Sequence, residues 1–514
     1  RAAGTYSLEG DSPCLRKQIE LTGPASLTVD ELRLFDGRID AGVTGGGRGL
    51  PLWSGDEWWL GIEYPLGYAE RTDDGVILRH FPGRALGEPL TSKTMVLGVA
   101  PEGRTARTAF DEYLRSIKRP SRSHLQYNSW YDLRGDAMTI DNMLEIARGF
   151  EENLLEPYDL HMDSFVPDDG WQDPQSIWEP REDLYPDGFA PMDATLSEMG
   201  IDLGLWMPLT GYKLDMDWAA GQGLEVASGG RYLCLSAPDS FEAMKQATAE
   251  RIRDGNLAYY KHDFNFLTCT AEGHGHLPTE RHSREANLDA LLGLLDWERE
   301  CNPGIFLNVT SLVWLSPWWL QHADTIWMCA SDFGFDRTYP QLSHREWAMS
   351  YRDAHFHNVY LRQRNPTPLS SLMTHGIIKG QRNRLGGPDE TIREWADYVA
   401  LYFGRGVLLK ELYLTPDLLS DEHWRAVGTC ARWATDNADV LERTKMFGGD
   451  PRQGEPYGFA HWRGNRGIIA LRNPGFRAMT LRVPIDEERG YLGDHEGPLA
   501  VRQIYPARHR LKSM

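Results

Sequence analysis

The stretch Leu257–Phe266 carries residues whose types and spacing suit chemistry. An apolar run, Leu257–Tyr260, predicts a buried strand, and three polar side chains follow it: Lys261, Asp263 and Asn265. Their alternate spacing places them on one face of an extended chain. A buried acid and base are costly to desolvate unless they pair or take part in a reaction. Taken alone, these residues could also form an ion pair with a purely structural role. The rest of the chain decides between a structural pair and a reactive one.

Further carboxylates follow other predicted strands, namely Asp168, Asp169 and Asp332. Two carboxylates, one ionised as a nucleophile and one protonated as an acid, suit the hydrolysis of a glycosidic bond. Lys261 would favour the ionised form of Asp263. Asp332 lies about two predicted strand–helix units after Asp263, so the two would occupy alternate strands. Three other acidic residues compete with Asp332 as the second carboxylate: Asp324, Asp336 and Glu272.

Strands alternate with helices from His124 onward, in units of roughly 30–45 residues with polar residues at the strand ends. This pattern predicts a (β/α)8 (TIM) barrel, in which the carboxyl ends of all strands meet at the face that carries active sites. The expected strands are 125–130, 161–167, 202–207, 232–235, 257–260, 305–309 and 325–329, completed by His355–Leu361 and 406–412. The expected helices between them are 139–153, 192–199, 240–254 and 283–299.

Both flanks of the barrel show the alternating pattern of antiparallel sheets. Residues 1–120 are expected to form an N-terminal β-sandwich that ends in an amphipathic helix, Ala106–Lys118. Residues 121–440 then form the barrel, and 441–514 a small C-terminal β-sandwich with strands near 457–462, 467–472 and 479–483. The fold class is therefore α/β, with a TIM barrel between two β domains.

Composition narrows the classes of partner. The 514 residues carry a formal net charge of −20, which argues against nucleic acid or an anionic membrane surface. No apolar run reaches the roughly 18–20 residues of a membrane span. Most of the 18 Trp are expected in aromatic cores, and stacking against sugar faces is another use for such a surplus. The six Cys are scattered and predict neither a disulfide framework nor a zinc ribbon. A secreted, periplasmic or cytoplasmic location stays open.

A second polar cluster, His274-Gly-His276 with His282 and Glu272, follows the Asp263 strand. These are suitable metal-ligand types. A polar loop that contacts substrate or a partner subunit is the favoured interpretation, because the ligand set is incomplete for a metal-dependent hydrolase. We therefore expect no metal and no cofactor.

Five motifs, taken in order, resemble the bacterial α-galactosidases of glycoside hydrolase family 36 and, more broadly, their clan with families 27 and 31. The motifs are Asn128-Ser-Trp130, Asp168-Asp-Gly-Trp171, Gly204-Leu-Trp206, Tyr260-Lys-His-Asp263-Phe-Asn265 and Ser331-Asp332. The resemblance covers nearly the whole chain, with a shortened N-terminal sandwich. Each motif alone is weak, and their order carries the resemblance.

The resemblance implies a retaining, exo-acting enzyme that removes α-linked galactose, or a modified galactose, from an oligosaccharide or glycoconjugate. Asp263 becomes the nucleophile and Asp332 the acid/base of a double displacement. Asp168 and Asp169 would accept hydrogen bonds from the 4- and 6-hydroxyls, and Lys261 would reach the 3- and 4-hydroxyls. The remaining expected substrate-binding residues are Trp171, Trp206, Asn265, Asn308 and Trp314. Related enzymes are often oligomers, which leaves a homo-oligomer open.

Three segments depart from the family pattern, and the third of them concerns the pocket wall around the sugar 2-position. His262 stands where the family usually has Trp, Met207-Pro-Leu-Thr where a Pro-Glu usually follows, and 306–311 where a Cys-Ser-Gly-Gly strand usually faces the sugar 2-position. An α-N-acetylgalactosaminidase, an enzyme for anhydro- or sulfated galactose, and a transglycosylase therefore stay open. A non-catalytic carbohydrate-binding protein and a metal-dependent hydrolase are alternatives of other classes.

Overall fold

The computed structural model describes residues 1–8, 13–39, 42–336, 343–493, 495 and 497–510. Its centre is a sheet of parallel strands in the order β20-β19-β18-β17-β16-β15-β14-β22-β21. The two outermost strands, β20 (Leu372–Met373) and β21 (Ile377–Lys379), are consecutive pieces of one stretch of chain. The ends of the sheet therefore meet, and eight strand positions close a barrel, which confirms the predicted (β/α)8 fold. The other strands are β14 (His124–Asn128), β15 (Ser164–Val166), β16 (Leu203–Trp206), β17 (Leu257–His262), β18 (Phe306–Val309), β19 (Thr325–Trp327) and β22 (Leu409–Leu414).

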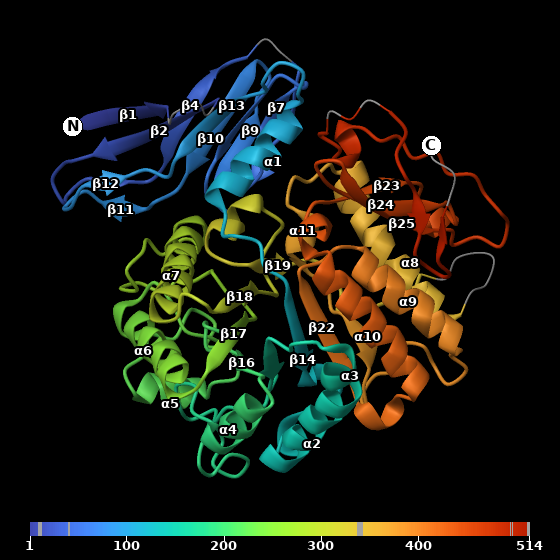
Figure 1. Ribbon diagram of the computed structural model, residues 1–514. Helices are drawn as coiled ribbons and strands as arrows, with labels where there is room; N and C mark the ends of the chain where they lie inside the picture. Colours follow the sequence, from blue (N-terminus) through green and yellow to red (C-terminus); the bar gives the residue numbers. More distant parts are fainter. Residues whose placement is uncertain (9–12, 40–41, 337–342, 494, 496, 511–514) are drawn as a thin grey trace.

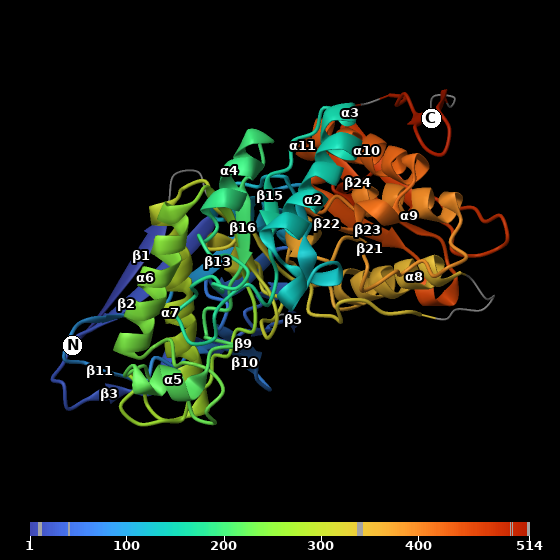
Figure 2. The same cartoon turned by 90° about the horizontal axis from the view of Figure 1, so that it is seen from below.

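Helices surround the strands on the outside of the barrel (Figure 2). They are α2 (Ile140–Phe150), α3 (Glu156–Tyr158), α4 (Ala190–Glu198), α5 (Met216–Gly221), α6 (Pro238–Asp254), α7 (Glu280–Cys301), α8 (His344–Phe356), α9 (Ile392–Gly404) and α10 (Asp421–Asp436). Thr and Ser side chains cap several of their first turns: the Thr391 hydroxyl accepts from Glu394 N while Glu394 accepts from Thr391 N. A 3₁₀ turn, Pro317–Gln321, takes the place of a helix between β18 and β19. None of the described helices is long and apolar enough to cross a membrane.

Two expected barrel strands are wrong. His355–Leu361 lies in the end of α8 and the π-helical turn His357–Arg362, and the seventh strand position is 372–379. That strand escapes a sequence pattern because it is split into pieces of two and three residues. Its break is tightly packed, since a Cβ on Gly376 would lie 1.8 Å from the Glu411 carbonyl oxygen. The expected strand at 232–235 is an isolated bridge between Val226 and Leu233.

The N-terminal part is a sandwich of antiparallel sheets (Figure 1). One sheet has the order β1-β2-β13-β8-β7-β5 with β12 beside β2, and the facing sheet has the order β4-β10-β9-β6. The inward positions alternate as a half-buried strand requires, for example Val76, Leu78 and His80 of β10. The strand bounds are β1 (Ala2–Leu8), β2 (Cys14–Leu21), β3 (Thr28–Val29), β4 (Leu32–Arg38), β5 (Val43–Gly45), β6 (Gly47–Arg48), β7 (Leu52–Ser54), β8 (Trp58–Ile62), β9 (Tyr68–Arg71), β10 (Gly75–His80), β11 (Arg84–Ala85), β12 (Leu90–Thr91) and β13 (Met95–Val99). Helix α1 (Ala106–Ile117) leads into the barrel, as expected.

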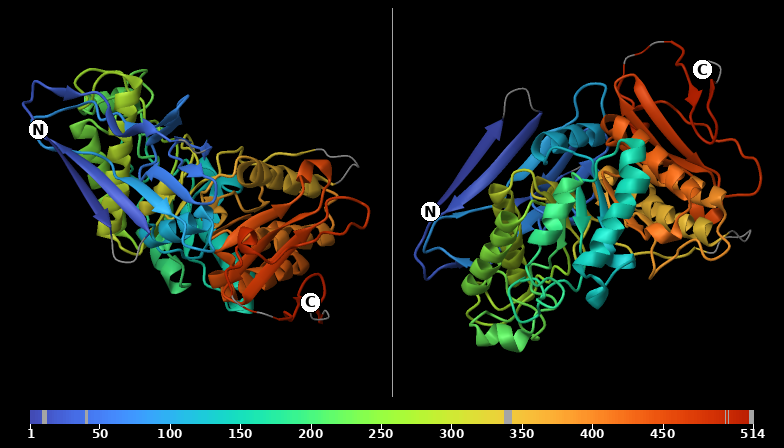
Figure 3. Two further views of the ribbon diagram at one scale, coloured as in Figure 1. Left: turned by 90° about the horizontal axis from the view of Figure 1, so that it is seen from above. Right: turned by 60° about the horizontal axis from the view of Figure 1, so that its bottom comes forward.

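The C-terminal part begins after α11 (Ala438–Leu441) with a three-stranded antiparallel sheet of β23 (Thr444–Gly448), β24 (Tyr457–Arg463) and β25 (Arg466–Arg472). A short pair, β26 (Arg502–Gln503) with β27 (His509–Arg510), follows. The expected strand at 479–483 is unpaired, and its apolar residues Leu481 and Val483 instead pack against Phe447 and Trp462 of the sheet. Figure 3 shows the two β parts on different sides of the barrel.

Candidate active site

All eight strand positions carry polar side chains at the carboxyl ends of the barrel strands, where active sites of this fold lie, or in the barrel interior below them. In strand order they are Asn128 of β14, Asp168 and Asp169 after β15, Trp206 of β16, Lys261 and Asp263 at the end of β17, Asn308 and Thr310 of and after β18, Asp332 after β19, His375 between β20 and β21, and Glu411 of β22. Asp263 follows the fourth strand and Asp332 the sixth. The expected placement of these two residues on alternate strands is therefore confirmed.

Asp263 is held by three donors. Its Oδ2 accepts from Trp206 Nε1 at 3.1 Å, and its Oδ1 accepts from Thr310 Oγ1 at 2.8 Å and from Phe264 N at 2.9 Å. The last contact depends on the backbone of Phe264, which has a left-handed φ of +49°. Such a conformation is costly for a residue with a side chain and is often found at functional sites. The result is a carboxylate with 9% exposure and a fixed orientation.

Lys261 and Asp168 form a buried ion pair beside Asp263. Lys261 Nζ donates to Asp168 Oδ2 at 2.8 Å, and Asn128 Nδ2 donates to the same oxygen at 2.8 Å. Burial lowers the pKa of Lys261, but the negative charges of Asp168, Asp263 and Glu411 outweigh it and hold that pKa above its usual value. Lys261 is therefore a cation between two carboxylates.

Asp169 is more accessible than Asp168. Its Oδ2 lies 3.3 Å from Lys213 Nζ, and its side chain is 17% exposed. Burial and the charge of Asp168 raise the pKa of Asp169 above its usual range, against the opposing charge of Lys213. The two neighbouring carboxyl groups therefore differ. Asp168 is held by hydrogen bonds from Lys261 and Asn128, and Asp169 is partly open to solvent.

Asp332 follows β19 and is half-exposed, with 48% of its side chain accessible. Its Oδ2 accepts from Trp130 Nε1 at 3.3 Å, and its Oδ1 lies 3.4 Å from His375 Nε2. Burial raises the pKa of Asp332, but the hydrogen bond and charge of His375, the charge of Lys261 and the Trp130 hydrogen bond outweigh it. The pKa of Asp332 therefore lies well below its usual range in this state.

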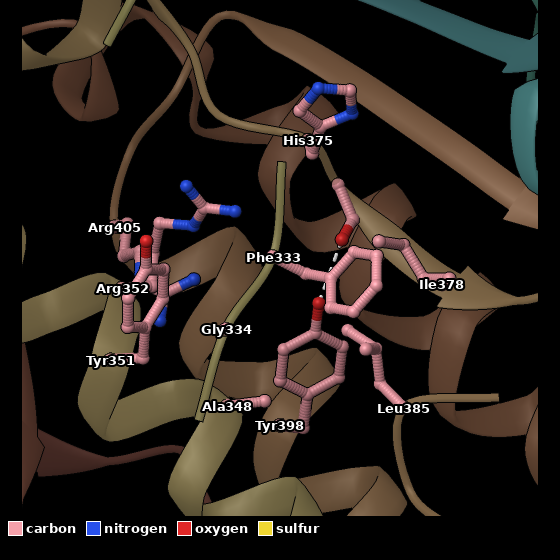
Figure 4. Close-up of a pocket in the computed structure, with 11 residues that line it drawn as sticks. Phe333, Gly334, Ala348, Tyr351, Arg352, His375, Ile378, Leu385, Tyr398 and Arg405 are labelled. Carbon is pink, nitrogen blue, oxygen red and sulfur yellow. Dashed lines mark hydrogen bonds between the residues drawn. The ribbon is translucent and has the colours of Figure 1, made fainter. Parts of the chain in front are cut away.

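His375 occupies the break in the seventh strand with a left-handed φ of +45°. Its ring packs against Trp327, Tyr131 and Tyr413, with centroid separations of 4.9, 5.6 and 5.6 Å. Figure 4 shows it among the residues that line a small cavity, together with Arg352 and Arg405. The Nδ1 atom is buried, and no partner for it is found among the described residues. The strained backbone and the aromatic clamp aim Nε2 at Asp332.

Two residues that are expected to bind substrate, Trp171 and Asn265, donate to the backbone around the site. Trp171 is fully buried and donates from Nε1 to the Trp206 carbonyl oxygen at 2.9 Å. Asn265 donates to the carbonyl oxygens of His262, Thr310 and Ser311, which ties the chain after β17 to the chain after β18. Their roles toward a substrate stay predictions.

Two other expected contacts have different surroundings. Asn308 is buried inside the barrel, where it donates to Tyr259 Oη at 2.8 Å and accepts from Thr325 Oγ1 at 3.0 Å. Trp314 donates from Nε1 to the Pro65 carbonyl oxygen at 2.6 Å, and the Arg48 guanidinium lies 4.0 Å from its ring centroid. The N-terminal sandwich therefore holds Trp314. Its role, like that of Asn308, stays a prediction.

The sequence interpretation missed four polar residues of the site as functional candidates: Trp130, Thr310, His375 and Glu411. Trp130 lies in the first family motif and Thr310 in the 306–311 segment, but nothing in the sequence says which way their side chains point. His375 and Glu411 belong to strand positions seven and eight. The seventh was misplaced, so no signal marked His375 as a strand-end residue.

The expected second cluster after β17 is divided in the structure. His282 faces away from His274 and His276, with Nε2 3.0 Å from Asp30 Oδ1 and Nδ1 2.7 Å from Thr279 Oγ1. Glu272 is exposed. The competing carboxylate Asp324 pairs with Arg299 at 2.9 Å, on the amino side of β19, away from the strand ends.

Three solved structures are similar to this chain in fold. A variant of the family 36 α-galactosidase AgaA from Geobacillus stearothermophilus, solved with raffinose, has a TM-score of 0.64 and 13% identity over 91% of this chain and 72% of that chain. The galactosidase domain of α-galactosidase-sucrose kinase has a TM-score of 0.63 and 13% identity over 98% and 73%. The α-galactosidase from Lactobacillus brevis has a TM-score of 0.63 and 12% identity over 99% and 75%. This is the fold of the family 36 α-galactosidases. No family model and no curated protein matches the sequence.

Within the family 36 fold, the departure at His262 lies outside the site. His262 is fully buried, and its Nε2 lies 2.8 Å from Glu298 Oε2 of α7 while Nδ1 lies 2.9 Å from the Met207 carbonyl oxygen. Because side chains alternate along a strand, His262 points to the helix layer when Lys261 and Asp263 point to the barrel mouth. This substitution therefore changes the contact between strand and helix, not the pocket wall.

Proposed function

We propose that the protein is a retaining, exo-acting α-glycosidase that hydrolyses terminal α-linked galactose, or a modified galactose, from an oligosaccharide or glycoconjugate. The observation that carries the proposal is the pair Asp263 and Asp332 at the ends of strands four and six of a barrel with the family 36 fold. Raffinose bound to the AgaA variant supports an α-galactoside as the substrate class.

In the first step a carboxylate oxygen of Asp263 attacks the anomeric carbon, and the bond to the leaving oxygen breaks. Asp332 gives its proton to that oxygen. The hydrogen bonds to Asp263 from Trp206, Thr310 and Phe264 support this role, because they fix the nucleophile before substrate arrives. In the second step Asp332 takes a proton from water, which attacks the same carbon and frees Asp263, so the configuration is retained.

Sugar hydroxyls would be recognised by the charged groups beside the nucleophile. Asp168 and Lys261 are locked to each other and to Asn128, so they offer oxygens and N–H groups in fixed positions. Asp169 is the more accessible carboxylate of the pair and is free of that lock. A neutral polyol with adjacent hydroxyls suits this array better than a charged ligand, because its hydroxyls donate and accept at the same site.

The test is a panel of aryl α-glycosides with the β-galactoside as control, followed by proton NMR of the sugar first released. The proposal predicts cleavage of the α-galactoside or the α-N-acetylgalactosaminide, with the α-anomer appearing first. Asp263→Asn and Asp332→Asn should each lower kcat by at least about a hundredfold while the circular dichroism spectrum is kept. Release of the β-anomer first, or near-normal rates in either variant, would overturn it. A high acceptor concentration in the same assay separates hydrolysis from transglycosylation.

A further inference from the structure

Four metal-ligating side chains meet at a place outside the strand-end site. Cys234 lies in the segment between α5 and α6, and Cys269, His274 and His276 lie in the connection from β17 to α7. Their ligand atoms all lie within 4.8 Å of one another. In the part of the chain that the structure describes, this is the one such group of three or more His, Cys, Asp or Glu side chains.

Two sulfur–nitrogen distances within the group are those of a tetrahedral metal centre. Cys234 Sγ lies 3.4 Å from His276 Nε2, and Cys269 Sγ lies 3.5 Å from His274 Nδ1. A tetrahedron with metal–sulfur bonds of about 2.3 Å and metal–nitrogen bonds of about 2.0–2.1 Å has sulfur–nitrogen edges of about 3.5 Å. Two separate thiol–imidazole hydrogen bonds would explain each distance, but they would not require all four atoms to converge.

The surroundings prepare the ligands. Both cysteines are buried, with exposures of 1%, and the two histidines are half-buried. His276 Nδ1 lies 2.9 Å from the Leu277 carbonyl oxygen, so the ring proton belongs on Nδ1 and the lone pair of Nε2 faces Cys234. The Asn287 amide nitrogen lies 3.6 Å from Cys234 Sγ while it donates to Ser283 O at 2.8 Å. The Asn287 side-chain oxygen lies at the same distance of 3.6 Å from Cys234 Sγ, so this amide offers the sulfur both a donor and an acceptor.

The backbone between the two histidines is also specialised. Gly275 has a left-handed φ of +77°, and a Cβ there would lie 2.7 Å from the Ser236 carbonyl oxygen. Ser236 Oγ donates to the His274 carbonyl oxygen at 3.3 Å. The His-Gly-His turn is therefore pressed against the segment that carries Cys234, which brings ligands from two distant parts of the sequence together.

We propose that Cys234, Cys269, His274 and His276 bind one zinc ion as a closed structural site. Two thiolates and two imidazoles are the ligands that zinc prefers, whereas calcium and magnesium require oxygen. Four protein ligands leave no position for a water or a substrate, so the ion is structural. On binding, both thiols release their protons to solvent, and the two thiolates neutralise the dipositive ion.

The ion would join two connections that line the same side of the barrel mouth. The 264–279 connection begins directly after Asp263, and its Phe264 and Phe266 rings stack on Tyr212 and Tyr232 at 3.8 and 4.2 Å between centroids. Tyr232 lies two residues before Cys234, and Phe266 lies three residues before Cys269. Zinc therefore fixes the two segments that carry this aromatic stack.

The experiment uses the full chain without a histidine tag, prepared under reducing conditions, stripped with a chelator and reloaded with zinc. We expect one zinc per chain by elemental mass spectrometry, and X-ray absorption with two sulfur atoms at about 2.3 Å and two nitrogen atoms at about 2.0–2.1 Å. Cys234→Ser and Cys269→Ser should lose the ion, and Cys301→Ser, which changes a cysteine at the end of α7, should keep it. Zinc should raise the Tm of the stripped wild type and leave that of Cys269→Ser unchanged.

A stoichiometry below about a tenth of an equivalent after reloading would overturn the site, as would wild-type zinc content in both cysteine variants. If Cys234 and Cys269 form a disulfide in the isolated protein and the reduced protein still takes up no zinc, the site is also overturned. If the cysteine variants fail to fold, two other measurements test the site. They are the zinc content of His276→Gln and the absorption spectrum of the stripped wild type titrated with cobalt. Thiolate-to-cobalt charge-transfer absorption supports the site, and its absence contradicts it.

Discussion

At the scale of single residues, the proposed acid presents a physical problem. An acid must carry a proton before it donates one, yet His375 and Lys261 hold the pKa of Asp332 well below its usual range. His375 is kept in that position by a left-handed backbone and three aromatic rings. The environment of Asp332 in the free protein therefore favours the base form, which the second step needs. We expect substrate to weaken the contact between Asp332 and His375, so that the carboxyl group can take up the proton that the first step needs.

His375→Gln tests this coupling. The change removes a group that lowers the pKa of Asp332, so that pKa rises and the acid stays protonated to higher pH. We expect the alkaline limb of the kcat/KM profile to move up by roughly one pH unit for an aryl galactoside with a poor leaving group. A galactoside whose leaving group needs no proton is the control, and its alkaline limb should not move. An unchanged limb with the poor leaving group would show that His375 does not set the protonation of Asp332.

At the scale of elements, strand–helix contacts behind the site position the charged residues in front of it. β17 presents Lys261 to the barrel mouth and His262 to α7, where Glu298 is fully buried and lies 2.8 Å from the imidazole.

The outer layer is less regular than the strand ring. It contains π-helical turns at Glu151–Leu155 and His357–Arg362 and a 3₁₀ turn at Pro317–Gln321.

Glu298→Ala should lower the free energy of unfolding by about 1–3 kcal/mol, because it leaves the buried Nε2 of His262 without its hydrogen-bond partner. Urea unfolding followed by tryptophan fluorescence measures the change. Glu300→Ala, an exposed residue of the same helix, is the matched control and should stay within about 0.5 kcal/mol of wild type. Equal effects of the two substitutions would mean that the β17–α7 contact does not depend on this pair.

The sequence predicted those elements whose pattern is local. β17 and β18 are runs of apolar residues that end in polar ones, and the motifs around Asp168 and Asp263 lie directly after such runs. The split seventh strand has no such run, because its two pieces are held by β19 and β22 from other parts of the chain. The meeting of Cys234 with His276 was equally hidden, since only the fold brings those distant residues together. Side-chain direction at strand ends, as for Trp171 and Trp130, is likewise decided by tertiary packing.

At the scale of the whole molecule, the two β parts are fastened to the barrel by buried polar contacts. Glu285 of α7 accepts from His80 Nδ1 at 2.7 Å and from Phe81 N at 2.6 Å, both in the N-terminal sandwich. On the other side, Asp353 of α8 accepts from Arg405 Nε at 2.7 Å and from Tyr457 of the C-terminal sheet. The N-terminal sandwich also supplies Arg48 and Pro65 to Trp314, so it belongs to the support of the site.

Glu285→Ala should destabilise the protein by about 2–3 kcal/mol, because it leaves buried donors of the sandwich without an acceptor. Asp289→Ala is one turn further along α7, where the side chain is 44% exposed and pairs with Lys93, and it should cost less than about 1 kcal/mol. The midpoints of guanidinium unfolding compare the two variants. If Asp289→Ala costs as much as Glu285→Ala, the buried contact is not what holds the sandwich to the barrel.

The most direct test of the proposed mechanism is azide rescue of the two aspartate variants with an activated aryl α-galactoside, or the α-glycoside that the panel selects. In Asp263→Ala, azide should restore aryl release and yield the β-glycosyl azide, because it attacks from the face that the carboxylate has vacated. In Asp332→Ala, azide should intercept the sugar bound to Asp263 and yield the α-glycosyl azide. Opposite anomers from the two variants would establish Asp263 as the nucleophile and Asp332 as the acid/base. The same anomer from both, or unimpaired turnover in Asp263→Ala without azide, would contradict that assignment.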